Sequence, residues 1–317
     1  MDLLRNYFLK KLTFLTLILG ALGAQETSLK AATGTLMGMG YSSHGQLGLG
    51  TVAEWHNPVP IFDEVASIAV GDLHSLYLTS DGILMAMGEN GNGQLGDGTN
   101  IDRLTPVPIA TDVQAIAAGY IHSLYLTSAV ILMGMGNNGT GQLGDGTNIE
   151  RLIPIQIATD VQAIAVGDLH SLYLTSDGTL MGMGYNDHGQ LGDGTTNDHL
   201  TPILIATDVQ AIAAGGLHSL YLTSDGTLMG MGNNAAGQLG DGTTNDHLTP
   251  IPIATDVQAI TAGSAHNLFL KNGGTLMGMG YNANGQLGDG TMIDRHEPVQ
   301  IAMDVQAIAV GSWHSFY

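Results

Sequence analysis

Six histidines recur at a fixed interval of 48 residues, and they are the first candidates for chemistry in this chain. Imidazole is a common ligand of transition metals and a frequent general base in enzymes. Equivalent positions of a regular repeat would lie on a wide circle, however, too far apart to share one ion. We therefore predict structural hydrogen bonding for His74, His122, His170, His218, His266 and His314.

Serine follows the periodic histidine in every copy except the fifth, which has Asn267. Neighbours in a strand point to opposite faces, so this pair cannot act as nucleophile and base. The chain has no cysteine and no Gly-x-Ser-x-Gly segment. An active site is one asymmetric constellation, whereas these polar residues recur evenly. We expect no catalytic residue, no cofactor and no enzyme activity.

Acidic residues form the second candidate set, because Gly-Asp-Gly-Thr is followed five residues later by another acid. Such carboxylates, with a threonine hydroxyl and open carbonyls, could hold calcium, which takes roughly six to eight oxygens. Turns favour aspartate for backbone reasons alone, and the spacing matches no EF-hand. We favour the turn role and keep calcium as an alternative for Asp97 and Asp102, Asp145 and Glu150, Asp193 and Asp198, Asp241 and Asp246, and Asp289 and Asp294.

Methionine pairs also recur, from Met37 and Met39 to Met277 and Met279. Thioethers can bind copper(I), but methionine also fills irregular gaps in a core. We expect these side chains to pack inside the protein.

The elements that must position these residues are short strands. Gly-Thr-Leu-Met-Gly-Met-Gly returns, with small changes, at Gly34, Gly82, Val130, Gly178, Gly226 and Gly274. In the fourth copy we predict strands at 179–184, 202–205, 209–214 and 218–223, separated by Gly, Asp and Ser turns. Four strands in about 40 to 50 residues make one blade of a β-propeller.

The motif Met-Gly-Met-Gly-Tyr-Asn-x-x-Gly-Gln-Leu-Gly-Asp-Gly, then a proline strand and Ala-Ile-Ala-Ala-Gly-x-x-His-Ser-Leu-Tyr-Leu, resembles the RCC1 (regulator of chromosome condensation) repeat over residues 34–317. Methionine stands where that family usually has tryptophan. The resemblance implies that the periodic histidine holds the blade together, and that strands from both termini close the ring. We expect an all-β, RCC1-like propeller of six four-stranded blades, or one blade short of the seven of better-known members. Residues 305–317 would pair with strands near Leu36 and Pro58.

The first 24 residues are typical of a signal peptide, with a basic start and an uncharged stretch from Leu12 to Ala24. That stretch is too short for an ordinary membrane span, although an uncleaved anchor is an alternative. We predict a secreted or periplasmic protein with a short linker at 25–33. The formal net charge of −20 disfavours nucleic acid and anionic membranes and favours cations or basic partners. We expect no stable membrane insertion after cleavage.

Two loops differ between otherwise matching copies, one after the methionine strand and one before the periodic histidine. Variable side chains on a rigid frame are typical of a recognition surface, although drift at exposed loops explains them equally well. We predict a non-catalytic protein-binding scaffold. The alternatives are a calcium-stabilised surface or matrix protein and an enzyme inhibitor resembling the family's secreted β-lactamase inhibitors. The candidate binding residues are Tyr41, His44, Asp72, Leu73, Tyr120, Ile121, Tyr185, His188 and Trp313.

Overall fold

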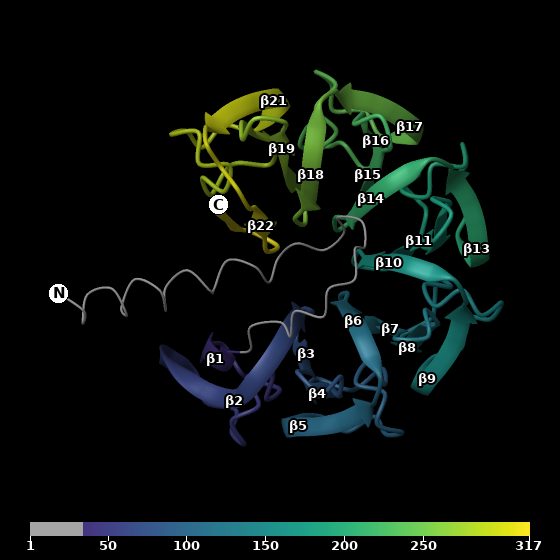
Figure 1. Cartoon of the computed structure of the whole chain (residues 1–317), viewed down its shortest axis with the longest axis vertical. Coiled ribbons are helices and arrows are strands. Elements are labelled where there is room, and N and C mark those ends of the chain that lie inside the picture. The colour runs from purple at the N-terminus through teal and green to yellow at the C-terminus, as the bar shows by residue number, and fades with distance from the viewer. Residues whose placement is uncertain (1–33) are drawn as a thin grey trace.

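The computed structural model describes residues 34–317, which form short antiparallel strands arranged as blades around a central axis (Figure 1). This stretch contains no helix, and hence none that could cross a membrane. The predicted leader at 1–24 and linker at 25–33 lie outside the described residues.

The first sheet has five strands, β1 (Gly34–Gly40), β2 (Trp55–Val70), β3 (His74–Thr79), β4 (Leu84–Gly88) and β5 (Arg103–Ala110). Four sheets of four strands follow. They are β6 (Val113–Ala118), β7 (His122–Thr127), β8 (Leu132–Gly136) and β9 (Arg151–Ala158); β10 (Val161–Val166), β11 (His170–Thr175), β12 (Leu180–Gly184) and β13 (His199–Ala206); β14 (Val209–Ala214), β15 (His218–Thr223), β16 (Leu228–Gly232) and β17 (His247–Ala254); and β18 (Val257–Ala262), β19 (His266–Lys271), β20 (Leu276–Gly280) and β21 (Arg295–Ala302). A two-stranded sheet, β22 (Ala309–Val310) and β23 (Ser315–Phe316), comes last.

The strands of the fourth copy follow the predicted pattern, and the outermost one is longer than expected. β13 covers His199–Ala206, whereas the sequence indicated 202–205. It lies at the edge of its sheet and pairs only with β12. An edge strand tolerates a residue without an N–H, so Pro202 does not end the strand.

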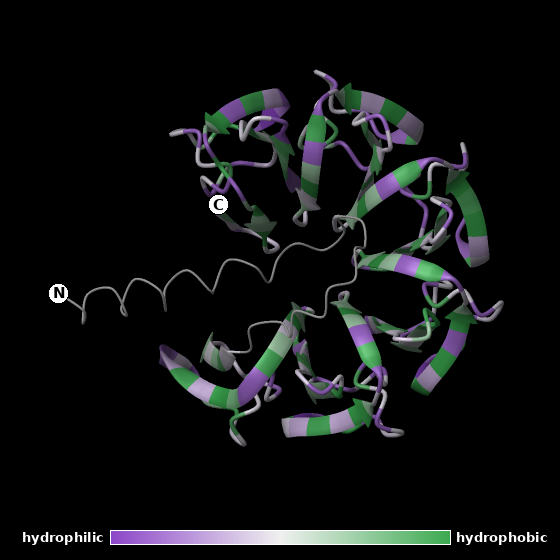
Figure 2. Ribbon diagram, viewed as in Figure 1, coloured by the Kyte–Doolittle hydropathy of each residue, from purple (hydrophilic) through white to green (hydrophobic). Residues whose placement is uncertain are grey.

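The hydrophobic core lies between successive blades. One cluster joins Leu124, Leu132 and Leu143 of one blade to Tyr173 and Met183 of the next. Met183 is completely buried, as are its counterparts at 135, 231 and 279. Hydrophobic and hydrophilic residues alternate along the outer strands (Figure 2), so that one side of each strand faces this core. Each blade is therefore stabilised by its neighbours.

The all-β propeller is confirmed, but the expectation of six blades is wrong, because the structure contains five. Blade and repeat are offset by two strands. The fourth blade takes β14 and β15 from the copy that begins at Gly178, and β16 and β17 from the copy that begins at Gly226. Six copies therefore build five blades and leave a half blade at each end.

The predicted closure is also wrong. Among the described strands, β1 pairs only with β2 and β22 only with β23, so residues 305–317 do not join the strands near Leu36 and Pro58. The ring is open between these two half blades (Figure 1). Each terminal half blade packs on the full blade next to it, as Ile308 does on Leu268 and Leu36 does on Tyr77.

Candidate functional site: the loop face and its axial pocket

The two variable loops lie on the same face of the ring, which we call the loop face. In the first blade, Glu89 N–H donates to the carbonyl of Leu73 over 2.8 Å. Tyr185 makes the same bond to Leu169 over 3.0 Å. The aromatic rings of Tyr281 and Trp313, one from each kind of loop, lie 5.6 Å apart in an edge contact. The antiparallel strand order brings both loops together, because β3 leaves this face and β4 returns to it.

A pocket of about 350 Å³ opens on the ring axis, and each of the six copies contributes three consecutive residues to its wall. The middle residue of each triplet is glycine, and its lack of a side chain is required. A Cβ added to Gly167 would lie 2.2 Å from Cε1 of His170 and 2.5 Å from the carbonyl oxygen of Gly215 in the next blade. The glycines therefore let the histidines and the neighbouring backbone approach the axis.

Five periodic histidines stand behind these glycines and bond from blade to blade. Nε2 of His122 lies 2.9 Å from Oγ of Ser171, and Nε2 of His170 lies 2.9 Å from Oγ of Ser219. The same contact joins His74 to Ser123, His218 to Asn267 and His266 to Ser315. His314 is exposed at the open end of the ring. We call the five buried residues, His74, His122, His170, His218 and His266, the histidine belt.

The third residue of each triplet differs between copies, which makes the pocket asymmetric. Asp72, Tyr120 and Asp168 come from three successive copies. Gly216, Ser264 and Ser312 complete the set, with Trp313 beside them. Tyr120 is 48% exposed and Trp313 is 54% exposed, so two aromatic surfaces stand open at the pocket.

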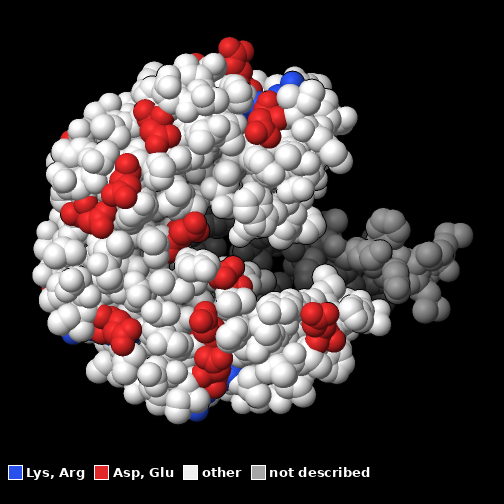
Figure 3. Space-filling view, turned by 180° about the vertical axis from the view of Figure 1, so that it is seen from behind, with Lys and Arg blue, Asp and Glu red and all other residues white. Residues whose placement is uncertain are grey.

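The described wall of the pocket carries negative charge from Asp72 and Asp168. Burial, and then the nearby Asp72 carboxylate, raise the pKa of Asp168. Among residues 34–317, no Lys or Arg lines the pocket, and Arg103, Arg151 and Arg295 are paired with aspartates of the turns. Acidic side chains border the central hollow in Figure 3. Such a site favours a cation, because the two carboxylates repel one another and the aromatic faces attract positive charge.

The other predicted binding residues lie farther out on the loop face or below it. Tyr41 is exposed, whereas Leu73 and Ile121 are half-buried. Nδ1 of His44 lies 2.8 Å from Asp102, and Nδ1 of His188 lies 2.6 Å from Asp246. Tyr185 donates its hydroxyl to Asp187 over 3.0 Å. Of the nine predicted residues, the structure brings Asp72, Tyr120 and Trp313 together at the pocket.

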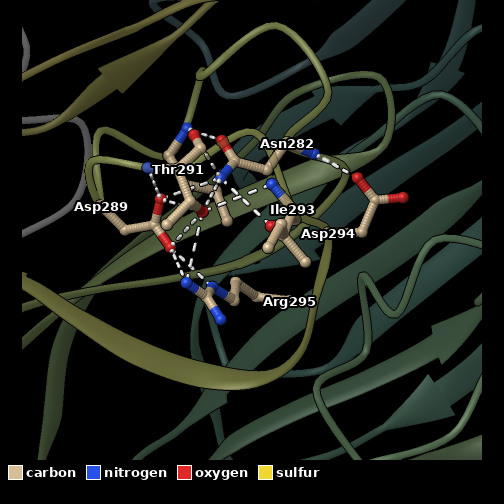
Figure 4. Close-up of polar contacts among 7 residues, drawn as sticks. Asn282, Asp289, Thr291, Ile293, Asp294 and Arg295 are labelled. Carbon is tan, nitrogen blue, oxygen red and sulfur yellow. Dashed lines mark hydrogen bonds and ion pairs between the residues drawn. The ribbon is translucent and has the colours of Figure 1, made fainter.

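The acidic turns are held by hydrogen-bond donors (Figure 4). Asp289 accepts bonds from Asn282 Nδ2 at 3.0 Å, from Thr291 N–H at 2.9 Å and from Arg295 Nε at 2.6 Å. Asp294 accepts from the N–H of Asn282 over 2.7 Å. Burial acts to raise the pKa of Asp289, but the bonds from Thr291, Arg295 and Asn282 outweigh it and hold the pKa at about 2.

Equivalent bonds surround the first acid of the other four pairs, with an arginine at Asp97 and Asp145 and a histidine at Asp193 and Asp241. A cation would have to displace these donors, so the geometry favours the turn role over calcium. Within residues 34–317 no group of three or more His, Cys, Asp or Glu side chains could hold a metal ion.

Asp168 is the pocket residue that sequence reasoning missed. A usable signal was present, because Asp168 lies two repeat lengths after Asp72 and occupies the same position before a periodic histidine. The proximity of the two carboxylates was not available from the period, because it depends on how strongly the ring curves.

Comparisons with known proteins agree with this architecture. The family model of the RCC1-like domain matches residues 6–317. Human WBSCR16 has a similar structure, with 26% identity and a TM-score of 0.78 over 88% of this chain and 79% of that one. Yeast RCC1 (Prp20) has a similar fold in two structures, with 19% and 20% identity, TM-scores of 0.63 and 0.64, and coverage of 93% of this chain and 93% and 94% of those chains. A search of curated proteins found no match. The resemblance seen in the repeat is thus confirmed, and the chain belongs to the RCC1-like domain family.

Proposed function

We propose that this protein is a non-catalytic scaffold that holds a protein partner on its loop face, with a basic side chain of the partner in the axial pocket. The observation that carries the proposal is the pocket itself. It unites Asp72, Asp168, Tyr120 and Trp313 on one ring, and the third residue of its triplets changes between Asp, Tyr, Gly and Ser from copy to copy. A guanidinium or ammonium group would pair with the carboxylates and lie against the aromatic faces.

Protein binding by similar folds supports this function. One structure of yeast RCC1 shows it bound to Kap60, and another study of the same protein concerns its binding to Gsp1p and histones. Histones are strongly basic, as the acidic pocket of the present chain would require of a partner. The periodic histidines, and the serines that follow them, recur almost evenly along the repeats, in keeping with a scaffold rather than with one asymmetric active site.

The test compares two double variants that remove the same charge. Asp72→Asn with Asp168→Asn alters the pocket, whereas Asp177→Asn with Asp225→Asn alters exposed turns between β11 and β12 and between β15 and β16. The probe is a fluorescent peptide with a central arginine, titrated with the full chain and followed by anisotropy. We expect the pocket variant to bind about 10- to 100-fold more weakly, since bonds between charged groups contribute about 1.5–3 kcal/mol.

The control variant should lose affinity only slightly, because exposed charges far from the peptide are screened by salt. Replacing the arginine of the peptide with citrulline should abolish the difference between the two variants. Equal weakening by both variants would show attraction to the net charge and contradict a pocket.

Export is a second part of the proposal and is supported by the predicted leader at 1–24. Intact-mass measurement of the protein recovered outside the cytoplasm tests it. A chain shortened near residue 23 or 24 is expected, and full-length protein confined to the cytoplasm would contradict export.

A further inference from the structure

The hydrogen bonds around the histidine belt determine which ring nitrogen carries the proton. Oγ of Ser123 donates to the carbonyl of Gln94 over 2.8 Å. A hydroxyl has one proton, so Ser123 can only accept in its 2.9 Å contact with Nε2 of His74. Nε2 of His74 is therefore the donor. The same chain of bonds runs from His122 through Ser171 to Gln142 and from His170 through Ser219 to Gln190.

The fifth copy reaches the same result with different chemistry. Asn267 donates Nδ2 to the carbonyl of Gln238 over 2.7 Å, which directs its Oδ1 toward Nε2 of His218 at 2.8 Å. An amide oxygen only accepts, so His218 donates from Nε2 as the others do. A serine and an asparagine thus impose one tautomer.

In none of the five belt histidines does the second ring nitrogen have a hydrogen-bond partner within residues 34–317. Nδ1 of each belt histidine is buried without a hydrogen bond. At His170 this side of the ring lies against Gly167, where an added Cβ would meet Nδ1 at 2.5 Å. The titratable groups that act on the ring of His170 are His122 and His218 in the adjacent blades. Asp72 and Asp168 lie two residues before His74 and His170 but make no hydrogen bond with either ring.

A proton added to Nδ1 would therefore place a buried charge beside glycine, with other imidazoles nearby and with no hydrogen-bond acceptor from the described part of the chain. Burial lowers the pKa of His74 and His218 to about 4. Burial and then neighbouring histidines lower the pKa of His122 and His170 to about 3, and that of His266 to about 4.

We propose that the histidine belt is an acid-labile latch between the blades. It holds the blades together while all five rings are neutral, and acid favours the unfolded chain because only there can the rings take up protons. The folded protein excludes these protons, whereas the unfolded chain binds them below a pH of about 6.5. The contribution of the belt to the free energy of unfolding is therefore complete above that pH and is lost as the pH falls from about 6.5 toward 4. As the pH falls through this range, each belt histidine makes the unfolding constant rise by a factor that approaches tenfold per pH unit near pH 5.

Urea unfolding of the full chain between pH 7.5 and pH 5 tests the latch, because the slope of the logarithm of the unfolding constant against pH counts the protons taken up. Near pH 5, His170→Gln should reduce that count by about one proton, whatever it does to stability at neutral pH. His56→Gln is the control, since His56 is exposed on β2, and it should leave the count within a few tenths of the parent value.

Nitrogen NMR of the histidine rings in the folded parent gives a second readout that needs no variant. Five rings should show a proton on Nε2 and a bare Nδ1 at pH 7, and the same signals should persist at pH 5.5. An unchanged proton count in His170→Gln, a proton on Nδ1, or belt rings that titrate near pH 6.5 in the folded protein would overturn the proposal.

Discussion

Replacing Gly167 with alanine tests whether the close approach at the axis holds the ring together. The added Cβ would lie 2.2 Å from Cε1 of His170 and 2.5 Å from the carbonyl oxygen of Gly215. Neither neighbour can yield easily, because the histidine is completely buried and the carbonyl belongs to the next blade. One methyl group should therefore disturb both a blade and its junction.

The cost follows from three contributions. Forcing a methyl group into a packed site costs about 1–3 kcal/mol. Displacing His170 from Ser219 costs about 1 kcal/mol more for the lost hydrogen bond. Alanine restricts the unfolded chain and returns about 0.4–1 kcal/mol. We expect a net loss of about 1–3.5 kcal/mol, which lowers the Tm of a chain of this length by roughly 2–6 °C.

Urea and thermal unfolding of the full chain, followed by circular dichroism, measure this loss. Gly91→Ala is the matched control, because its added Cβ would have only Glu89 nearby, at 4.0 Å, and its backbone suits any residue. The control should be unchanged or slightly more stable. If Gly167→Ala were as stable as Gly91→Ala, His170 and the backbone at Gly215 would have room for a side chain at position 167, and the claim that glycine is required there would be wrong.

Three further predictions concern single positions. Val130 has a φ of 57° at the position that Gly82 and Gly178 occupy in other copies, and a left-handed backbone strains a branched residue. Val130→Gly should therefore stabilise the protein by about 1 kcal/mol in urea unfolding. An equal or lower stability would argue against strain. Asn282→Ala should lower the free energy of unfolding by about 2 kcal/mol or more, because it removes the bond to Asp289 and leaves the buried N–H of Leu287 unpaired. Asn284→Ala, at an exposed position, should lower it little in the same assay. Millimolar calcium should leave the Tm unchanged, because N–H and O–H donors already occupy oxygens of Asp289; a clear rise would revive the calcium alternative.

The strands and turns of one copy could be predicted from the sequence, because they depend on local features. Alternation at 179–184 and glycine at Gly178 act over a few residues and recur in each copy. The edge strand was predicted too short, since only its position at the margin of the sheet makes Pro202 harmless. The candidate site was found in part: the variable loops contained Asp72, Tyr120 and Trp313, but periodicity alone did not single out Asp168.

The sequence by itself determined the period of 48 residues, the all-β class and the membership of a propeller family, because each copy carries the whole pattern of strands, turns and core residues. The tertiary structure decided how many blades form and whether they close. Blades combine strands from two successive copies, and the turn between them comes from packing of residues such as Met183 against the neighbouring sheet. The same packing brought Asp72 and Asp168 to one pocket and, among the described residues, left one nitrogen of each belt histidine without a hydrogen-bond partner. These are contacts between copies, and no single copy encodes them.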